Sequence, residues 1–305
     1  EGPRDPVKDS ILLECFGRHK NLVSASKIVA EEEGKIRYMM KGNFDNAQAQ
    51  KGFVNLIGED IGTTRLFSPW EKIQDTDRYA FAPMLVKSYD PAVYARLMKR
   101  HDHEEIINYT RRYTQHMVHG RVGINYLVIE PDALLNNEVD STYFSGKIVI
   151  LAYVNTNDFD IEDKKFTPMN EKLAGKQYPD MSGAIIHANI ISMMLDNNYI
   201  NKLPTWVAFL VAVLIGWLHM SFFIHYYIET HLWFHLVAKL AQLISAVLFA
   251  YVGMYLFNRY RIKLDMSLTI IVIVLSVDII YFYEAFAVWM HKRFGFKTVF
   301  HQKHH

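Results

Sequence analysis

The sequence has little cysteine and almost no net charge. Cys15 is its single cysteine, so no disulfide can form within the chain and its stability cannot depend on one. The 33 Lys and Arg residues nearly balance the 32 Asp and Glu residues, which leaves a formal net charge of +1. Proteins that bind nucleic acid usually carry a concentrated basic face. We therefore expect no nucleic-acid partner.

The sequence also lacks the short motifs of common catalytic sites. It contains no Walker phosphate-binding loop, no GxSxG nucleophile turn and no metal-ligand spacing in its polar half. We therefore expect a protein that is not an enzyme, and we expect no bound cofactor and no metal site.

Charge is distributed unevenly along the chain, and its distribution marks two parts. Residues 1–203 carry 25 basic and 28 acidic residues, whereas residues 204–305 carry 8 and 4. Two hundred residues can bury a sizeable core, so we expect a soluble domain over 1–203. Strand-like runs alternate there with helical patterns, which is typical of a layered α/β fold.

The second part holds three apolar runs of membrane length. Each is as long as the roughly 20 residues that a helix needs to cross the hydrocarbon core of a bilayer. The runs lie at about 206–228, 234–257 and 267–290. We therefore expect an all-α bundle of three transmembrane helices over 204–291, followed by a short basic cytoplasmic tail over 292–305.

One stretch joins the two parts. Residues 147–154 (KIVILAYV) are apolar on both faces, which predicts a strand buried inside a sheet. A polar loop follows, and residues 183–197 then have the apolar spacing of a helix. We expect this helix and the linker to Pro204 to form a lever into the bilayer.

Several stretches, taken in order, resemble the second class of CHASE domain, an extracytoplasmic sensory module of bacterial membrane receptors. The resemblance covers roughly residues 9–290, and a set of membrane helices after the sensory domain also suits the family. The stretches are 21–29 with its Ser-Ala-Ser core, 52–56 followed by 62–65, 124–126 before 144–150, Thr167-Pro168, and 183–189 before Pro204.

The resemblance implies a multi-pass protein of the bacterial inner (cytoplasmic) membrane, with its sensory domain outside the cytoplasm. It also implies a membrane helix and a first strand–helix–strand ahead of residue 1, so we expect the N-terminal part of the domain to be missing here. The family usually continues into a kinase, cyclase or similar output domain, whereas residues 292–305 are too short for one. The Lys and Arg distribution leans slightly toward the same orientation.

Three functions follow as hypotheses. The first is a non-enzymatic, sensor-like protein that transmits an extracytoplasmic signal to a separate partner. The second is a structural or accessory subunit of a larger membrane complex, which docks through the sensory domain. The third is a transport or redox subunit that uses Asp278 and the histidines His219, His225, His231 and His235. The expected partners are the lipid bilayer and either other membrane subunits or a separate signalling protein.

Polar side chains beyond residues 147–154 are candidates for ligand contact, because ligands of α/β sheets often bind beyond the carboxyl ends of strands. Asn155, Asn157 and Asp158 follow that run directly, and Thr167 lies later in the same loop. The acidic residues of the loop, Asp158 to Asp163, could bind Ca²⁺. They lack the spacing of an EF-hand, and a solvated loop is the alternative.

His187 and Asn189 lie near the start of the helix predicted over 183–197. Free backbone N–H groups at a helix start can hold an anionic or polar ligand, so both residues are ligand candidates. The alternative is that the two side chains tie the loop to the sheet.

Ionisable residues also occur in the apolar runs. Asp278 lies at the centre of the third run, Glu284 follows it, and Lys239 lies near the start of the second. A carboxylate at the bilayer centre costs about 3 kcal/mol even on mild scales, so we expect Asp278 to face the bundle or a partner; a proton or ion site is the alternative. Ala246 and Ala250 form a small-xxx-small face that lets helices approach closely.

Overall fold

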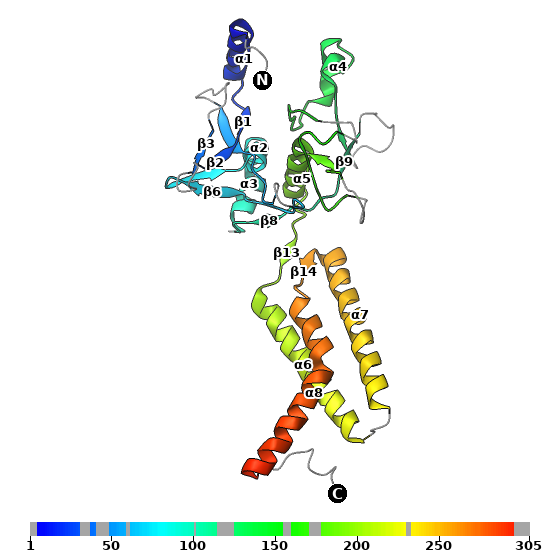
Figure 1. Cartoon of the computed structure of the whole chain (residues 1–305). Coiled ribbons are helices and arrows are strands. Elements are labelled where there is room, and N and C mark those ends of the chain that lie inside the picture. The colour runs from blue at the N-terminus through cyan, green and yellow to red at the C-terminus, as the bar shows by residue number, and fades with distance from the viewer. Residues whose placement is uncertain are drawn as a thin grey trace. The chain divides into compact units, whose positions relative to one another are not determined.

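The structure is a computed structural model that describes residues 5–30, 37–40, 49–58, 62–100, 102–114, 125–154, 160–170, 178–229 and 233–295. The chain divides into two units, Glu1–Tyr199 and Ile200–His305. Figure 1 shows the elements of each unit, and the two are described separately.

Two helices of the first unit, those that begin at Pro6 and Pro91, start with a capping aspartate. Asp90 Oδ1 accepts hydrogen bonds from the backbone nitrogens of Ala92 (2.9 Å) and Val93 (3.2 Å), and Pro91 occupies the first helical position. Both features stabilise a helix start. The helices are α1 (Pro6–Arg18), α2 (Phe81–Tyr89), α3 (Pro91–Met98), α4 (Pro131–Leu135) and α5 (Gly183–Leu195), with a 3₁₀ turn at Ser141–Tyr143.

Strands of the first unit are short and pair two at a time. The antiparallel pairs are β2 (Ile28–Ala30) with β3 (Arg37–Met39), β5 (Leu66–Phe67) with β8 (Glu105–Ile106), β6 (Trp70–Ile73) with β7 (Thr76–Tyr79), and β11 (Lys164–Lys165) with β12 (Met181–Ser182). The parallel pairs are β1 (Val23–Ser26) with β4 (Gln50–Phe53), and β9 (Arg112–Thr114) with β10 (Asn125–Leu127). Over the described ranges the unit is therefore helix-rich with small sheets, rather than built on one layered sheet.

The core of the first unit forms around α5. Ile186, Ile190 and Met194 recur every four residues and are almost fully buried, as expected for one face of a helix. They pack against α2 and α3 in the main apolar cluster. Burial of this apolar surface is the main source of stability for the unit.

Gly52 allows β4 to pass against the start of α2. A Cβ at this position would press on the Phe81 Cα and lie 2.8 Å from the Phe81 nitrogen. Backbone atoms cannot move aside as a flexible side chain can, so the close approach requires glycine.

The prediction of a buried strand over 147–154 is wrong. These residues form no strand, and the exposed fractions of Val149, Leu151 and Tyr153 are 56%, 90% and 58%. Ile148, Ile150 and Val154 pack against the main cluster. Within the described part of the chain, the backbone of 148–154 forms no hydrogen bond. The side chains of this segment therefore alternate as in a strand. One set packs against the core, and the other set is apolar and exposed to solvent.

The second unit contains three helices long and apolar enough to cross a membrane: α6 (Thr205–Glu229), α7 (Phe234–Tyr260) and α8 (Ser267–Phe294). Contacts of α8 with α6 and α7 hold them together, and α7 and α8 run in opposite directions (Figure 1). Gly216 lets α6 approach α8, because a Cβ there would lie 2.8 Å from Val272 Cγ1. A short parallel pair, β13 (Asn201–Lys202) and β14 (Ile262–Lys263), lies before α6 and between α7 and α8.

A buried amide joins α7 to α8. Gln242 Nε2 donates to the carbonyl oxygens of Ile273 (2.9 Å) and Val274 (2.8 Å), and its side chain is 6% exposed. Polar side chains of this kind hold membrane helices together where the hydrophobic effect between helices is weak.

Candidate functional site

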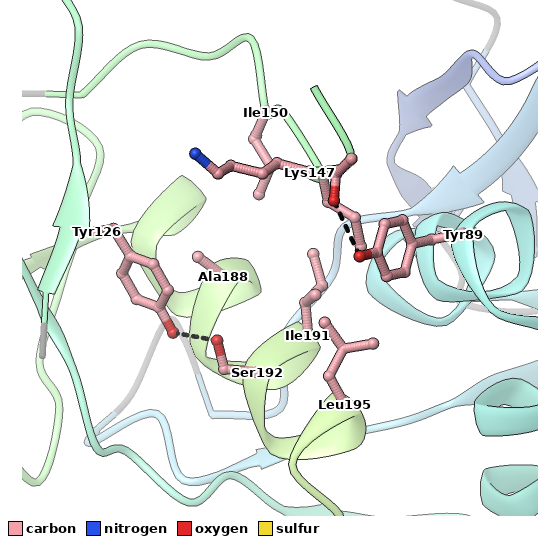
Figure 2. Close-up of a pocket in the computed structure, with 10 residues that line it drawn as sticks. Tyr89, Tyr126, Lys147, Ile150, Ala188, Ile191, Ser192 and Leu195 are labelled. Atoms are coloured by element: carbon pink, nitrogen blue, oxygen red, sulfur yellow. Dashed lines mark hydrogen bonds between the residues drawn. The ribbon is translucent and has the colours of Figure 1, made fainter. Parts of the chain in front are cut away.

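A pocket of about 230 Å³ lies between α5, the end of α2 and residues 146–150 (Figure 2). Pockets for drug-sized ligands usually measure about 300 to 1,000 Å³, so this one suits a smaller molecule. Its lining residues are Tyr89, Tyr126, Gly146, Lys147, Ile148, Ile150, Ala188, Ile191, Ser192 and Leu195.

Helix α5 supplies one wall of the pocket. Ala188, Ile191, Ser192 and Leu195 are spaced by three or four residues and therefore share one helix face. The core residues Ile186, Ile190 and Met194 occupy another face. A single helix thus contacts the hydrophobic core on one side and the pocket on the other, and a change at the pocket wall acts directly on the core helix.

Hydroxyl groups of Tyr126 and Ser192 meet at one end of the pocket (Figure 2). The Tyr126 hydroxyl donates to Ser192 Oγ at 2.8 Å, and Arg111 Nη1 donates to the same oxygen at 3.2 Å. Arg111 Nη2 also donates to Asp196 Oδ2 at 2.9 Å. Burial raises the pKa of the Tyr126 phenol, so this group stays protonated at neutral pH. The pocket thus has a polar end beside a guanidinium.

The opposite end is closed by a contact between α2 and the 146–150 segment. The Tyr89 hydroxyl donates to the Gly146 carbonyl oxygen at 2.9 Å. Lys147 Nζ donates to the Tyr143 carbonyl oxygen at 2.9 Å, and Figure 2 shows its amine directed away from Ile191 and Leu195. The ammonium group therefore belongs to the rim, and the walls between the two ends are apolar.

Asn189 lies on the core side of α5 and is fully buried. Its Oδ1 accepts hydrogen bonds from the backbone nitrogens of Thr110 and Arg111, both at 3.1 Å. Its Nδ2 donates to the carbonyl oxygens of Arg111 and Ile185, both at 3.0 Å. Asn189 therefore fastens the Arg111 backbone to α5, which positions the Arg111 side chain beside the pocket.

His187 is buried next to α2. Its ring meets the Phe81 ring edge-on, with 5.6 Å between centroids. Burial lowers the pKa of the imidazole to about 4, so the ring is neutral at pH 7. Neither His187 nor Asn189 lines the pocket. The structure gives both residues packing roles, and their predicted contact with a ligand stays a prediction.

The other loop candidates are only partly described. Asn155, Asn157 and Asp158 lie outside the described residues. Thr167 is buried, and its backbone nitrogen and Oγ1 donate to the two carboxylate oxygens of Asp180 at 2.8 and 2.6 Å. Thr167 thus joins two parts of the loop. Across the described ranges, no three His, Cys, Asp or Glu side chains gather as metal ligands would.

Polar residues of the helices have different surroundings. Asp278 and Lys239 are exposed on the outside of the bundle, and Glu284 is half-buried. Asp278 was expected to face either the bundle or a partner, and its exposure leaves only the partner position, which stays a prediction. His219 Nδ1 lies 2.9 Å from the Ile215 carbonyl oxygen and His225 is exposed. His231 and the side chain of His235 lie outside the described residues.

The residues that follow α5 are tied to the core by polar contacts. Asn108 Nδ2 donates to the Asn198 carbonyl oxygen at 2.9 Å. The Arg100 guanidinium lies 4.4 Å from the centroid of the Tyr199 ring and binds the carboxylate of Glu105, which is 2% exposed. Burial raises the pKa of Tyr199 to about 12. The end of α5 is therefore fixed to the same body that forms the pocket.

A comparison with protein families found one match. The model of the CHASE2 domain matches residues 2–223, well over half of the 305 residues. Comparisons with curated proteins and with solved structures gave no match. The matched segment contains the described elements of the first unit and most of α6. It confirms the resemblance that the sequence motifs indicated, and the chain belongs to the CHASE2 family of extracytoplasmic sensory domains.

Proposed function

We propose that this protein is a non-enzymatic membrane sensor that passes an extracytoplasmic signal to a separate partner. Its CHASE2 domain supports a sensing role. The observation that carries the proposal is the position of α5, which forms a pocket wall, fills the core and continues into the linker to α6. The domain lies outside the inner membrane of a bacterium, and the tail after α8 lies in the cytoplasm.

The pocket favours a small amphipathic ligand. Its Ile148, Ile150 and Ile191 side chains offer an apolar surface, whereas the Ser192 hydroxyl, which accepts from Arg111, offers a polar group at one end. A carboxylate or hydroxyl on a short apolar chain matches both features. A carboxylate would compete with Asp196 for Arg111 and so alter a contact at the C-terminal end of α5.

Two connections carry a displacement of α5 toward the membrane helices. The chain runs from α5 through Asn198 and Tyr199 into β13, which leads directly to α6. Backbone nitrogens of Asn201 and Leu203 donate to the carbonyl oxygens of Arg261 (2.8 Å) and Lys263 (3.1 Å). Because these acceptors lie between α7 and α8, movement of the linker acts on all three helices rather than on α6 alone.

Thermal unfolding of the full chain in detergent tests the proposal, with C3 to C6 monocarboxylates and alcohols as probes. We expect at least one probe to raise the melting temperature of the natural sequence. Ala188→Phe, which fills the pocket, should abolish the rise, and Ser192→Ala should weaken it. Leu135→Phe is a matched control, because Leu135 is 79% exposed on α4. Equal shifts in Ala188→Phe and the natural sequence would exclude the pocket as the binding site.

A second candidate function is an accessory subunit that docks on other membrane proteins. The exposed apolar row of Val149, Leu151 and Tyr153 favours it, since such rows with free backbone groups can pair with a strand of another chain. Affinity purification in mild detergent tests this candidate. A subunit that co-purifies with the natural sequence and is lost in Leu151→Lys would support docking. Retention of that subunit in Leu151→Lys would exclude this surface.

A further inference from the structure

Asp278 lies on the outer side of α8. The buried residues of this helix include Ile273, Val277 and Ile280, which face the bundle. At 3.6 residues per turn, Asp278 projects from the side roughly opposite to their common direction, and it is exposed. Within the described part of the chain it forms neither a hydrogen bond nor an ion pair. A carboxylate that faces lipid in this way raises the free energy of the folded protein in the membrane, and a cation from a partner would offset that cost.

Lys239 presents the opposite charge on α7. It is exposed and, among the described residues, has no hydrogen-bonding or ion-pairing partner. Leu243, Ala246 and Ala250 follow it at steps of four, three and four residues, so they share its stripe along the helix. The two alanines are small enough to let another helix approach closely. The stripe thus combines a cation with a surface suited to helix packing.

The two charges lie at nearly the same depth. Gln242 on α7 contacts Ile273 and Val274 on α8, which fixes the register of these two helices. With a rise of 1.5 Å per residue, Lys239 lies about 4.5 Å from Gln242, and Asp278 lies about 6 to 7.5 Å beyond the contact on α8. Both displacements have the same direction because the helices run oppositely (Figure 1). The depths therefore differ by about 3 Å or less, within reach of a lysine side chain.

We propose that a second copy of this chain covers Asp278, through an ion pair with Lys239 of that copy. Copies in one membrane share their orientation and depth, so a cation at the depth of Asp278 in one copy is at that depth in every copy. The two side chains leave the bundle from different helices. The contact therefore joins the outer face of α8 in one copy to the Lys239 stripe of α7 in another copy.

Charge reversal in the full chain tests the ion pair. Two differently tagged copies are expressed together, and the fraction that co-purifies in mild detergent is measured. We expect Asp278→Lys alone and Lys239→Asp alone each to reduce co-purification about tenfold, because every contact then joins like charges. Co-expression of one variant with the other should restore the natural fraction, since the mixed contacts join opposite charges.

Further variants keep the test decisive. Asp278→Asn and Lys239→Gln remove charge without adding any, so they should insert normally and still weaken the association. Arg259→Asp is a matched control, because Arg259 is exposed near the C-terminal end of α7. The proposal is overturned if the natural chain is monomeric, if a different membrane protein occupies the face, or if the mixed variants fail to restore association although each is inserted.

Discussion

Replacement of Asn189 by leucine tests whether Asn189 fastens the Arg111 backbone to α5 or contacts a ligand. The substitution keeps the branching of the side chain at Cγ and removes four hydrogen bonds to the backbone of Ile185, Thr110 and Arg111. Each bond contributes about 0.5 to 1.5 kcal/mol net. Since the Thr110 and Arg111 groups can be partly rehydrated, we expect Asn189→Leu to lower the free energy of unfolding by about 3 kcal/mol.

Hydrogen exchange of the full chain in detergent measures this loss of stability at the backbone amides of α5. A loss of about 3 kcal/mol corresponds to roughly a 100-fold loss of amide protection in α5, if exchange occurs through unfolding of the domain. Asn136→Leu is the matched control, because Asn136 is exposed and bonds only to neighbouring groups. We expect it to leave the protection of α5 unchanged.

The refuting result is equally specific. Asn189→Leu with natural amide protection, but without the probe-induced rise in melting temperature, would make Asn189 a ligand contact rather than a clamp. Asn189→Asp refines the result, because it keeps the acceptor for Thr110 and Arg111 and loses the two donated bonds. It also buries a carboxylate against the carbonyl oxygens of Arg111 and Ile185, so its loss of protection should be at least as large as that of Asn189→Leu.

Three further predictions follow from single positions. Gly52→Ala should destabilise the first unit by about 2 kcal/mol, because its Cβ meets the Phe81 backbone; limited proteolysis measures the loss. Gln242→Leu should lower the melting temperature of the helical unit, since it removes interhelical hydrogen bonds contributing about 1 kcal/mol. Burial holds the pKa of His187 at about 4 in the folded state, below the usual 6.5 of the unfolded chain. Stability should therefore be unaffected by this group above about pH 6.5 and fall by up to about 1.4 kcal/mol per pH unit between about pH 6.5 and 4; His187→Asn should flatten that part of the pH profile.

Each of these predictions has an outcome that contradicts it. Equal proteolysis rates for Gly52→Ala and Gly62→Ala would show that the close approach at Phe81 is not limiting, since Gly62 has open space for a Cβ. An unchanged melting temperature in Gln242→Leu would mean that apolar packing alone holds α7 against α8. A pH profile of stability that His187→Asn leaves unchanged between pH 4 and 6.5 would assign the dependence to other groups.

The membrane helices were the most predictable part of the molecule. A bilayer sets a minimum length of apolar sequence, and this constraint acts locally along the chain. The helix α5 was predictable for a related reason, because Ile186, Ile190 and Met194 repeat at the helical period. Its described end at Leu195 lies two residues before the predicted one. Both predictions depend on neighbours in sequence only.

The segment 147–154 shows that the pattern of apolar residues does not determine whether a neighbouring strand covers them. Its residues after Lys147 are all apolar or aromatic, which indicates burial of both faces in a sheet. Burial of the second face requires a neighbouring strand, and that neighbour is a long-range property that one segment does not contain. The described structure covers the face of Ile148 and Ile150 and leaves Val149 and Leu151 outside.

The pocket was not predicted, because its polar groups come from distant parts of the chain. Tyr126 and Ser192 are 66 residues apart in sequence, and Arg111 and Ser192 are 81 apart. A single sequence contains no signal for such pairs. One local signal was present, since Ser192 is a polar residue in the otherwise apolar run 190–195 of α5, where a packing role alone does not require it.

The pairing of β13 with β14 also fixes the rotational phase of α6. Asn201 and Leu203 are both hydrogen-bonded to the connection between α7 and α8, one residue on each side of Lys202. Two bonds along one strand resist twisting of the linker about its own axis, because a twist would turn both donors away from their acceptors. Torsion of α6 relative to the other helices is therefore opposed at its first turn. Tilting or sliding of the three helices as one body is the motion that this joint permits.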